Sequence, residues 1–258
     1  MDGATAFAGL DQQGLLAKGF VPSVQFNSLG TQSLPADKSY VPTGVTMMAA
    51  VVYNKTKVTN PPSTWQQLLS PQWKGVIGMN DPTQSGPTYP FIAGMMNYLG
   101  GVSQGEQFYA KLKANGLIIH PTNGPTLQAL TSGQIKLALV QSSAGTGAAL
   151  ADKQLAVKYL NPITLLPGAI GIDAKASPAV QAEAQKFIDY VLSPAGQKVM
   201  QSGDPTGDSL FYPVVQGVNP LSGLPSIASV QTQTIDPYKW GPQGGTINNW
   251  FVANIVKL

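Results

Sequence analysis

Three stretches in the middle of the chain share one order of apolar and polar positions. Val76 to Asn80 is a short apolar run, and after a turn the apolar residues return at the i, i+3, i+4, i+7 spacing of a helix face, at Ile92, Met95, Met96 and Leu99. The same succession of apolar run, turn and helical pattern recurs at 117–132 and at 135–151. Strands that alternate with helices at this spacing predict an α/β lobe with buried, largely parallel strands.

The segment before this lobe predicts three elements. Residues 1–20 begin with a polar Gly/Thr turn and continue as a short helical pattern, and residues 44–54 are apolar and valine-rich enough for one long buried strand. A Ser63/Thr64 cap then opens a short helix, which we expect to end before Pro71 because a proline disfavours helical geometry in the residue before it.

The last third of the chain predicts two helices and then a long irregular region. A strong amphipathic helix is expected over 177–192, with one apolar face made of Val180, Ala184, Phe187, Ile188, Val191 and Leu192. Ser193-Pro194 restarts a second helix that continues through Met200. After Gly203 the chain is rich in Gly, Pro and Asn, which predicts a loop-dominated wrap with a short final helix near Trp250.

Composition narrows the classes of partner. The 258 residues suffice for one large or two small domains, and charged residues are only 10% of the chain against about 25% in an average globular protein. All 15 basic residues are lysines, so bidentate recognition of phosphate or carboxylate by arginine is excluded. These lysines are scattered without a basic run, so we expect no nucleic-acid partner despite the net charge of +3. The absence of cysteine excludes disulfides and thiolate metal sites.

Three turns of the middle lobe each follow a strand, precede a helix and carry hydroxyl or amide side chains, at 81–88, 122–126 and 141–147. Such turns meet in a crevice at the carboxyl ends of parallel strands, where helix N-termini offer unpaired N–H donors. They predict a polar, largely neutral pocket with the candidate ligand-binding residues Ser85, Gly86, Thr88, Thr122, Asn123, Gln141, Ser142 and Ser143. The alternative is ordinary capping, because the same side chains satisfy the same donors in any α/β protein.

Enzymatic chemistry has little support in the sequence. His120 is the only histidine and is interpreted as a satisfied histidine at the end of an edge strand, and no G-x-S-x-G elbow accompanies the serines. The ten Asp and two Glu residues form no paired acid/base motif, and Asp81 can either hold a ligand amine or simply open its turn. We therefore assign no catalytic residue, no metal ligand and no cofactor.

Five segments of the chain resemble, in order, the type II extracytoplasmic substrate-binding proteins of ABC transporters, a class that includes ferric-iron, thiamine, polyamine and phosphonate binders. The segments are "VVYNKTKV" (51–58), "PPSTWQQLLSPQWKGVIGMNDP" (61–82), "NGPTLQALTSGQIKLALV" (123–140), "AEAQKFIDYVLSPAGQKVM" (182–200) and "YPVV" (212–215). The resemblance implies the periplasmic-binding-protein type II fold, with two α/β lobes joined by crossover strands and a hinge.

The resemblance also implies how the chain is divided and what it does. Lobe one would comprise 1–59 and 160–258 with the crossover strands 44–54 and 167–173, and lobe two would comprise 60–159. The implied function is that of a monomeric, non-enzymatic receptor that captures a small polar or anionic solute, such as an oxyanion, a phosphonate or a polyamine. It would deliver this solute to an ABC permease from the periplasm or the cell surface. Thr5 joins the predicted ligand-binding residues from lobe one.

Two departures from the family pattern matter. Ferric binders carry adjacent tyrosines where this chain has "QSSAG" (141–145), so phenolate ligation of iron is disfavoured and an organic or oxyanion solute is favoured. The chain also enters the family pattern near its third strand, so we expect lobe one to lack its N-terminal strands and this chain to contain no signal peptide. The alternatives are a hydrolase or another enzyme on the same architecture, or a ligand-sensing effector module.

Overall fold

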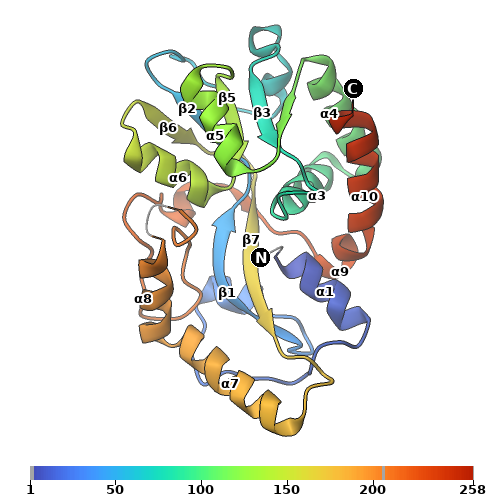
Figure 1. The fold of residues 1–258 in the computed structure, drawn as a ribbon, viewed down its shortest axis with the longest axis vertical. Helices are drawn as coiled ribbons and strands as arrows, with labels where there is room; N and C mark the ends of the chain where they lie inside the picture. The colour runs from blue at the N-terminus through green and yellow to red at the C-terminus, as the bar shows by residue number, and fades with distance from the viewer. Residues whose placement is uncertain (1–2, 205–206, 258) are drawn as a thin grey trace.

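The computed structural model describes residues 3–204 and 207–257 and contains two β-sheets (Figure 1). The smaller sheet has the order β1-β7-β8, with bounds Tyr40–Met47, Ile163–Gly171 and Thr232–Gln233. The larger sheet has the order β4-β3-β5-β2-β6, and its strands are β2 (Ala50–Asn54), β3 (Ile77–Asn80), β4 (Ile118–His120), β5 (Leu137–Val140) and β6 (Leu155–Lys158). Each sheet belongs to one of the two lobes of the fold.

The three predicted strand–turn–helix units are present in the larger sheet. Strand β3 leads to α3 (Thr88–Leu99), β4 leads to α5 (Asn123–Ser132), and β5 leads to α6 (Ser142–Ala151), while α4 (Val102–Ala114) follows α3. Strand β3 pairs in parallel with both β4 and β5, but β2 pairs antiparallel with β5 and β6. The three predicted strands therefore pair in parallel as expected, and the antiparallel pairs all involve β2, which lies outside the predicted units and enters this sheet directly from β1.

The long strand predicted at 44–54 is broken into β1 and β2. Ala49 adopts a left-handed conformation with φ 57°, and the N–H of Met48 turns to the carbonyl of Thr164 at 2.8 Å. The break lets the chain leave one sheet and enter the other, so the segment is not the single continuous strand that was predicted. Strand β7 returns antiparallel to β1, with Thr46 opposite Leu166, and Figure 1 shows the two strands side by side, running from the centre of the molecule into its lower half.

The helices α1 (Ala4–Gln12), α2 (Ser28–Gln32), α7 (Pro178–Leu192) and α8 (Pro194–Gly203) surround the smaller sheet. The predicted apolar face of α7 is only partly buried: Ile188 and Leu192 are in the core, whereas Val180 and Phe187 are 58% and 60% exposed. Nothing in the described part of the chain covers that side of α7. The expected short helix before Pro71 is instead a pair of 3-10 turns, at Gln66–Leu69 and Pro71–Trp73.

The predicted final helix is present as α10 (Gly244–Phe251), preceded by α9 (Pro237–Trp240) and followed by a π-helical turn at Val252–Val256. It packs against α4, with the rings of Phe251 and Tyr109 edge to face at 5.2 Å and Lys113 Nζ donating to the carbonyl of Ile255 at 2.6 Å. Residues 244–256 thus contact lobe two, although the sequence assigned them to lobe one. No helix in the described ranges is long and apolar enough to span a membrane.

Candidate functional site

A cleft of about 560 Å³ lies where the two lobes meet the crossing strands β1 and β7. Five of the nine predicted residues line it, Ser85, Gly86, Thr122, Asn123 and Gln141, together with Gln84 and Pro87 from the same turns. The rest of the lining comes from β1, β7 and the segment between α8 and Tyr212, and consists of Thr43, Gly44, Thr46, Leu166, Gly168, Met200, Asp208 and Phe211. The structure therefore brings all three predicted turns to one cleft.

Asn80, which the sequence did not single out, holds two of these turns together. Its side-chain amide donates to Oδ1 of Asn123 at 2.7 Å and to Oγ of Ser85 at 3.3 Å, and its Oδ1 accepts from Oγ of Thr126 at 2.6 Å. Asn80 is the last residue of β3 and is buried. The sequence signal that could have identified Asn80 is a polar residue at the end of an otherwise apolar strand. Such a residue is expected to be buried, and a buried amide requires hydrogen-bond partners.

The helices behind the three turns begin without side-chain caps. The N-cap residues of α3, α5 and α6 are Pro87, Thr122 and Gln141, and none accepts a hydrogen bond from its helix with its side chain. In α5 the N–H groups of Asn123 and Gly124 have no acceptor among the described residues. The capping alternative is thus wrong for these N-cap positions, and the first turn of α5 keeps free donors and a partial positive charge beside the cleft.

Asp81 opens its turn, which was one of the two interpretations of this residue. Its Oδ1 accepts from the backbone N–H and the hydroxyl of Thr83 at 2.8 and 2.7 Å, while its own N–H donates to the carbonyl of His120 at 2.8 Å. The carboxylate is buried and does not line the cleft. It therefore shapes the entry to α3 and is not free to hold an amine.

The crossing strands form the other wall. Oγ of Thr46 on β1 accepts from Nε2 of Gln141 at 2.9 Å, which ties the start of α6 to the hinge. Gly44 lies against the ring of Phe211, where a Cβ atom would come within 2.5 Å of the ring. Among the described lining residues Asp208 is the only ionisable group, and no lysine lines the cleft. Its polarity therefore comes from amides, hydroxyls and backbone dipoles.

Three predicted residues of these turns serve the fold and not the cleft. Ser142 is fully buried, and its Oγ accepts from the backbone N–H of Met47 at 2.9 Å. Ser143 is also fully buried, and its Oγ has no partner among the described residues. The buried Thr88 begins α3 with its N–H bonded to the carbonyl of Ser85 at 2.9 Å. Sequence alone could not tell which hydroxyls of a helical first turn face inward.

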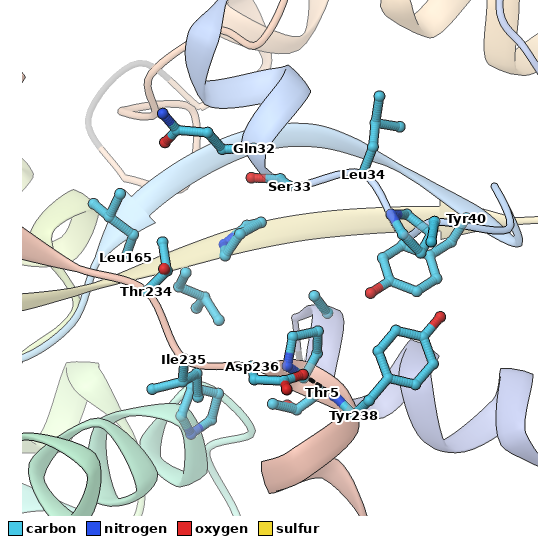
Figure 2. A pocket seen from close by; sticks show the side chains of 17 residues that line it. Thr5, Gln32, Ser33, Leu34, Tyr40, Leu165, Thr234, Ile235, Asp236 and Tyr238 are labelled. Carbon is cyan, nitrogen blue, oxygen red and sulfur yellow. Dashed lines mark hydrogen bonds between the residues drawn. The ribbon is translucent and has the colours of Figure 1, made fainter.

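Thr5 lies outside the cleft and lines a second cavity of about 290 Å³, which Figure 2 shows in close-up. This cavity is bounded by α1, β7 and the segment before α9, and several of its polar groups are already paired. The hydroxyl of Tyr238 donates to Oδ2 of Asp11 at 2.8 Å, and Oδ1 of Asp236 accepts from the N–H of Tyr238 at 2.9 Å. The side chains of this cavity are mainly apolar, in contrast to those of the polar cleft, with which it shares Leu166.

His120 ends the edge strand β4, as the sequence indicated, but it is not satisfied. Its Nε2 is buried without a hydrogen-bond partner in the described part of the chain, and its ring lies over Gly78. Burial lowers the pKa of the imidazole below its ordinary value. The described residues offer no cluster of three His, Cys, Asp or Glu side chains for a metal ion, and no tyrosine lines the cleft.

A sequence model of the bacterial extracellular solute-binding proteins matches residues 1–220. The chain belongs to this family. Solute-binding proteins of this kind are receptors and not enzymes, they bind small solutes for ABC permeases, and they work in the periplasm or outside the cell. The expected identity as the substrate-binding component of an ABC importer is thereby confirmed, and the enzyme and effector-module alternatives are not favoured.

Solved structures with low sequence identity share the two-lobe fold. AfuA from Actinobacillus pleuropneumoniae, with fructose-6-phosphate bound, is 17% identical, with a TM-score of 0.82 over 99% of this chain and 81% of its own. Iron-bound HitA from Pseudomonas aeruginosa is 18% identical, with a TM-score of 0.79 over 96% and 80%. A periplasmic thiamin binding protein is 20% identical, with a TM-score of 0.75 over 99% and 77%. The predicted type II fold is confirmed by these similarities.

Proposed function

We propose that this solute-binding protein captures a small organic solute through an oxyanion group, which binds at the N-terminus of α5 in the cleft. The observation that carries the proposal is the uncapped start of this helix between Thr122 and Gly124, with Thr122 and Asn123 lining the cleft. A helix N-terminus stabilises a nearby negative charge by about 0.3–1 kcal/mol, and by up to about 2 kcal/mol where the site is partly buried. Ser85 and Gln141 line the same cleft and add a hydroxyl and an amide to it.

The residues that line the cleft fit an oxyanion better than a polyamine or ferric iron, which other type II substrate-binding proteins bind. A polyamine would meet the positive end of α5 and a lining with a single carboxylate. Ferric iron would find neither a tyrosine nor a cluster of acidic side chains among the described residues of the cleft. The sugar phosphate bound to the similar AfuA structure carries an oxyanion of the proposed kind.

The proposal includes closure of the two lobes around the solute in a monomer. In this proposal lobe two comprises residues 60–159 together with β2, which pairs into its sheet, and the hinge lies where β1 passes into β2 at Ala49 and where β7 returns. The left-handed backbone of Ala49 and the tie between Gln141 and Thr46 lie at this passage. Hinges of this type absorb the change of dihedral angles in a few residues at the ends of elements.

Thermal-shift measurements and titration calorimetry with ethyl phosphate, ethanol, spermidine and ferric citrate test the proposal. Ethyl phosphate is expected to raise the melting temperature and to be recovered unchanged, while ethanol, which lacks the oxyanion, is expected to have no effect. Thr122→Val should weaken the binding of ethyl phosphate, whereas Thr131→Val, at the exposed far end of the same helix, should not. Binding of spermidine or ferric citrate without binding of ethyl phosphate would contradict the proposal.

A further inference from the structure

We infer that the solute also carries an ammonium group, which pairs with Asp208 on the wall opposite α5; this inference rests on the proposed function. Asp208 lines the same cleft as Thr122 and Asn123 and is the only ionisable residue among the described lining residues. The chemical class is therefore a short dipolar molecule, with an oxyanion such as phosphate at one end and a primary amine at the other.

The carboxylate of Asp208 is free for such a role. Asp208 is exposed, the described part of the chain provides its carboxylate with no hydrogen-bond donor, and the ion pairs found there join Lys18 to Asp11 and Asp37, and Lys186 to Glu183. In this respect Asp208 differs from Asp81, whose carboxylate is occupied by its own turn. An exposed carboxylate of a residue that lines the cleft is available to a cationic group of a ligand.

The backbone around Asp208 holds it at the cleft wall. The N–H of Asp208 donates to Oδ2 of Asp204 at 3.0 Å, and the hydroxyl of Ser209 donates to the carbonyl of Met200 at 2.5 Å. Four residues beyond Asp208, Tyr212 exchanges two backbone hydrogen bonds with Val45 of β1, at 2.8 and 2.9 Å. The segment that carries the carboxylate is therefore anchored both to α8 and to a crossing strand.

The two walls act in opposite directions on a solute with a single charge. A plain anion is stabilised by the start of α5 but repelled by Asp208, and this repulsion grows as water is excluded from between the two charges. A plain amine has the opposite problem. Only a solute that carries both charges gains from both walls, and closure of the lobes strengthens each term because it excludes water.

Titration calorimetry with phosphoethanolamine and ethyl phosphate isolates the contribution of the amine, because the two probes differ only in the ammonium group. The wild-type protein is expected to bind phosphoethanolamine at least tenfold more tightly than ethyl phosphate. Asp208→Asn should reduce this ratio to about twofold or less without weakening ethyl phosphate, and Asp208→Lys should invert the preference. Glu106→Gln removes the same charge from α4, whose residues do not line the cleft, and should keep the wild-type ratio.

The outcomes separate the two proposals. If ethyl phosphate binds as tightly as phosphoethanolamine, or if both Asp208 variants keep the wild-type ratio, the inference about the ammonium group is wrong and the oxyanion proposal stands. If neither phosphate binds, or if Thr122→Val leaves both affinities unchanged, the oxyanion proposal is wrong and the inference that rests on it is withdrawn with it. Thermal melting of each variant shows whether it is folded, and the wild-type ratio decides the inference even if a variant does not fold.

Discussion

Gly124 offers a substitution that should stabilise the protein and weaken solute binding at the same time. It is the second residue of α5, it is exposed, and a Cβ atom built on it meets no atom within 4 Å. The first turn of α5 contains no acidic residue. Gly124→Asp replaces the residue with the greatest backbone freedom and places a carboxylate at the positive end of the helix, so stability should rise by about 0.5–1 kcal/mol.

The same carboxylate competes with the solute. If the bound oxyanion lies about 6 Å from it, the repulsion is on the order of 0.7–3 kcal/mol for an effective dielectric constant between about 80 and 20, which weakens binding roughly 3- to 100-fold. The effect should be larger at low ionic strength, because salt screens exposed charges over about 10 Å at 0.1 M. Stability and affinity are therefore expected to change in opposite directions.

Urea unfolding and calorimetric titration with ethyl phosphate, each at low and at physiological salt, measure the two effects. Gly124→Asn is the matched control, because asparagine has nearly the shape of aspartate and no charge. We expect Gly124→Asn to bind within about twofold of the wild-type protein, in line with the small effect of exposed substitutions. If Gly124→Asp binds ethyl phosphate as tightly as Gly124→Asn, the oxyanion does not sit at the start of α5 and the proposed site is refuted.

Three further predictions concern polar residues of the larger sheet and of α6. Asn80→Ala should lower the free energy of unfolding, measured in urea, by about 2–3 kcal/mol, because it leaves partners of the buried side chain unpaired. An unchanged urea midpoint would contradict the role of Asn80 in holding the turns. Ser142→Ala should lower the free energy of unfolding by about 1–2 kcal/mol in the same assay, because it removes the hydrogen bond to Met47. Ser143→Ala changes the adjacent buried serine, which has no partner among the described residues, and should stay within about 0.5 kcal/mol of wild type. Equal effects of the two variants would refute the assigned bond to Met47. Burial lowers the pKa of His120 in the folded state, so the unfolded chain takes up the proton first as the pH falls. The free energy of unfolding should therefore decrease as the pH drops below about 6.5. His120→Asn should remove this pH dependence above pH 5, and an unchanged pH dependence would assign it to other groups.

The elements that depend on local pattern could be predicted from the sequence. The apolar spacing at Ile92, Met95, Met96 and Leu99 predicted α3, and the apolar face expected over 177–192 predicted α7. The break at Ala49 could not be predicted, because alanine carries no preference for a left-handed conformation. It follows from the passage of the chain between two sheets, which is a tertiary constraint.

The candidate site was predictable on one wall only. The turns of lobe two can be recognised in the sequence because hydroxyl and amide residues stand between a strand and a helix. Five of the nine predicted residues line the cleft. Asp208 lies in a Gly- and Pro-rich region far along the chain and reaches the cleft because Tyr212 pairs with Val45. No local pattern marks such a residue, since its position depends on a pairing between segments more than 160 residues apart.

The uncapped helices also indicate how the cleft could reject solutes that lack an acceptor. In the open cleft, water can satisfy the N–H groups of Asn123 and Gly124, for which the described residues provide no acceptor. Closure around an apolar solute would remove that water and leave each donor unpaired, at a cost of about 1–3 kcal/mol per group. An oxyanion replaces the water with charge-assisted bonds and avoids this cost. Selectivity in this receptor would then come from the cost of enclosing a solute without an acceptor as much as from attraction to an oxyanion. Backbone donors alone can provide this selectivity in a chain that contains no arginine.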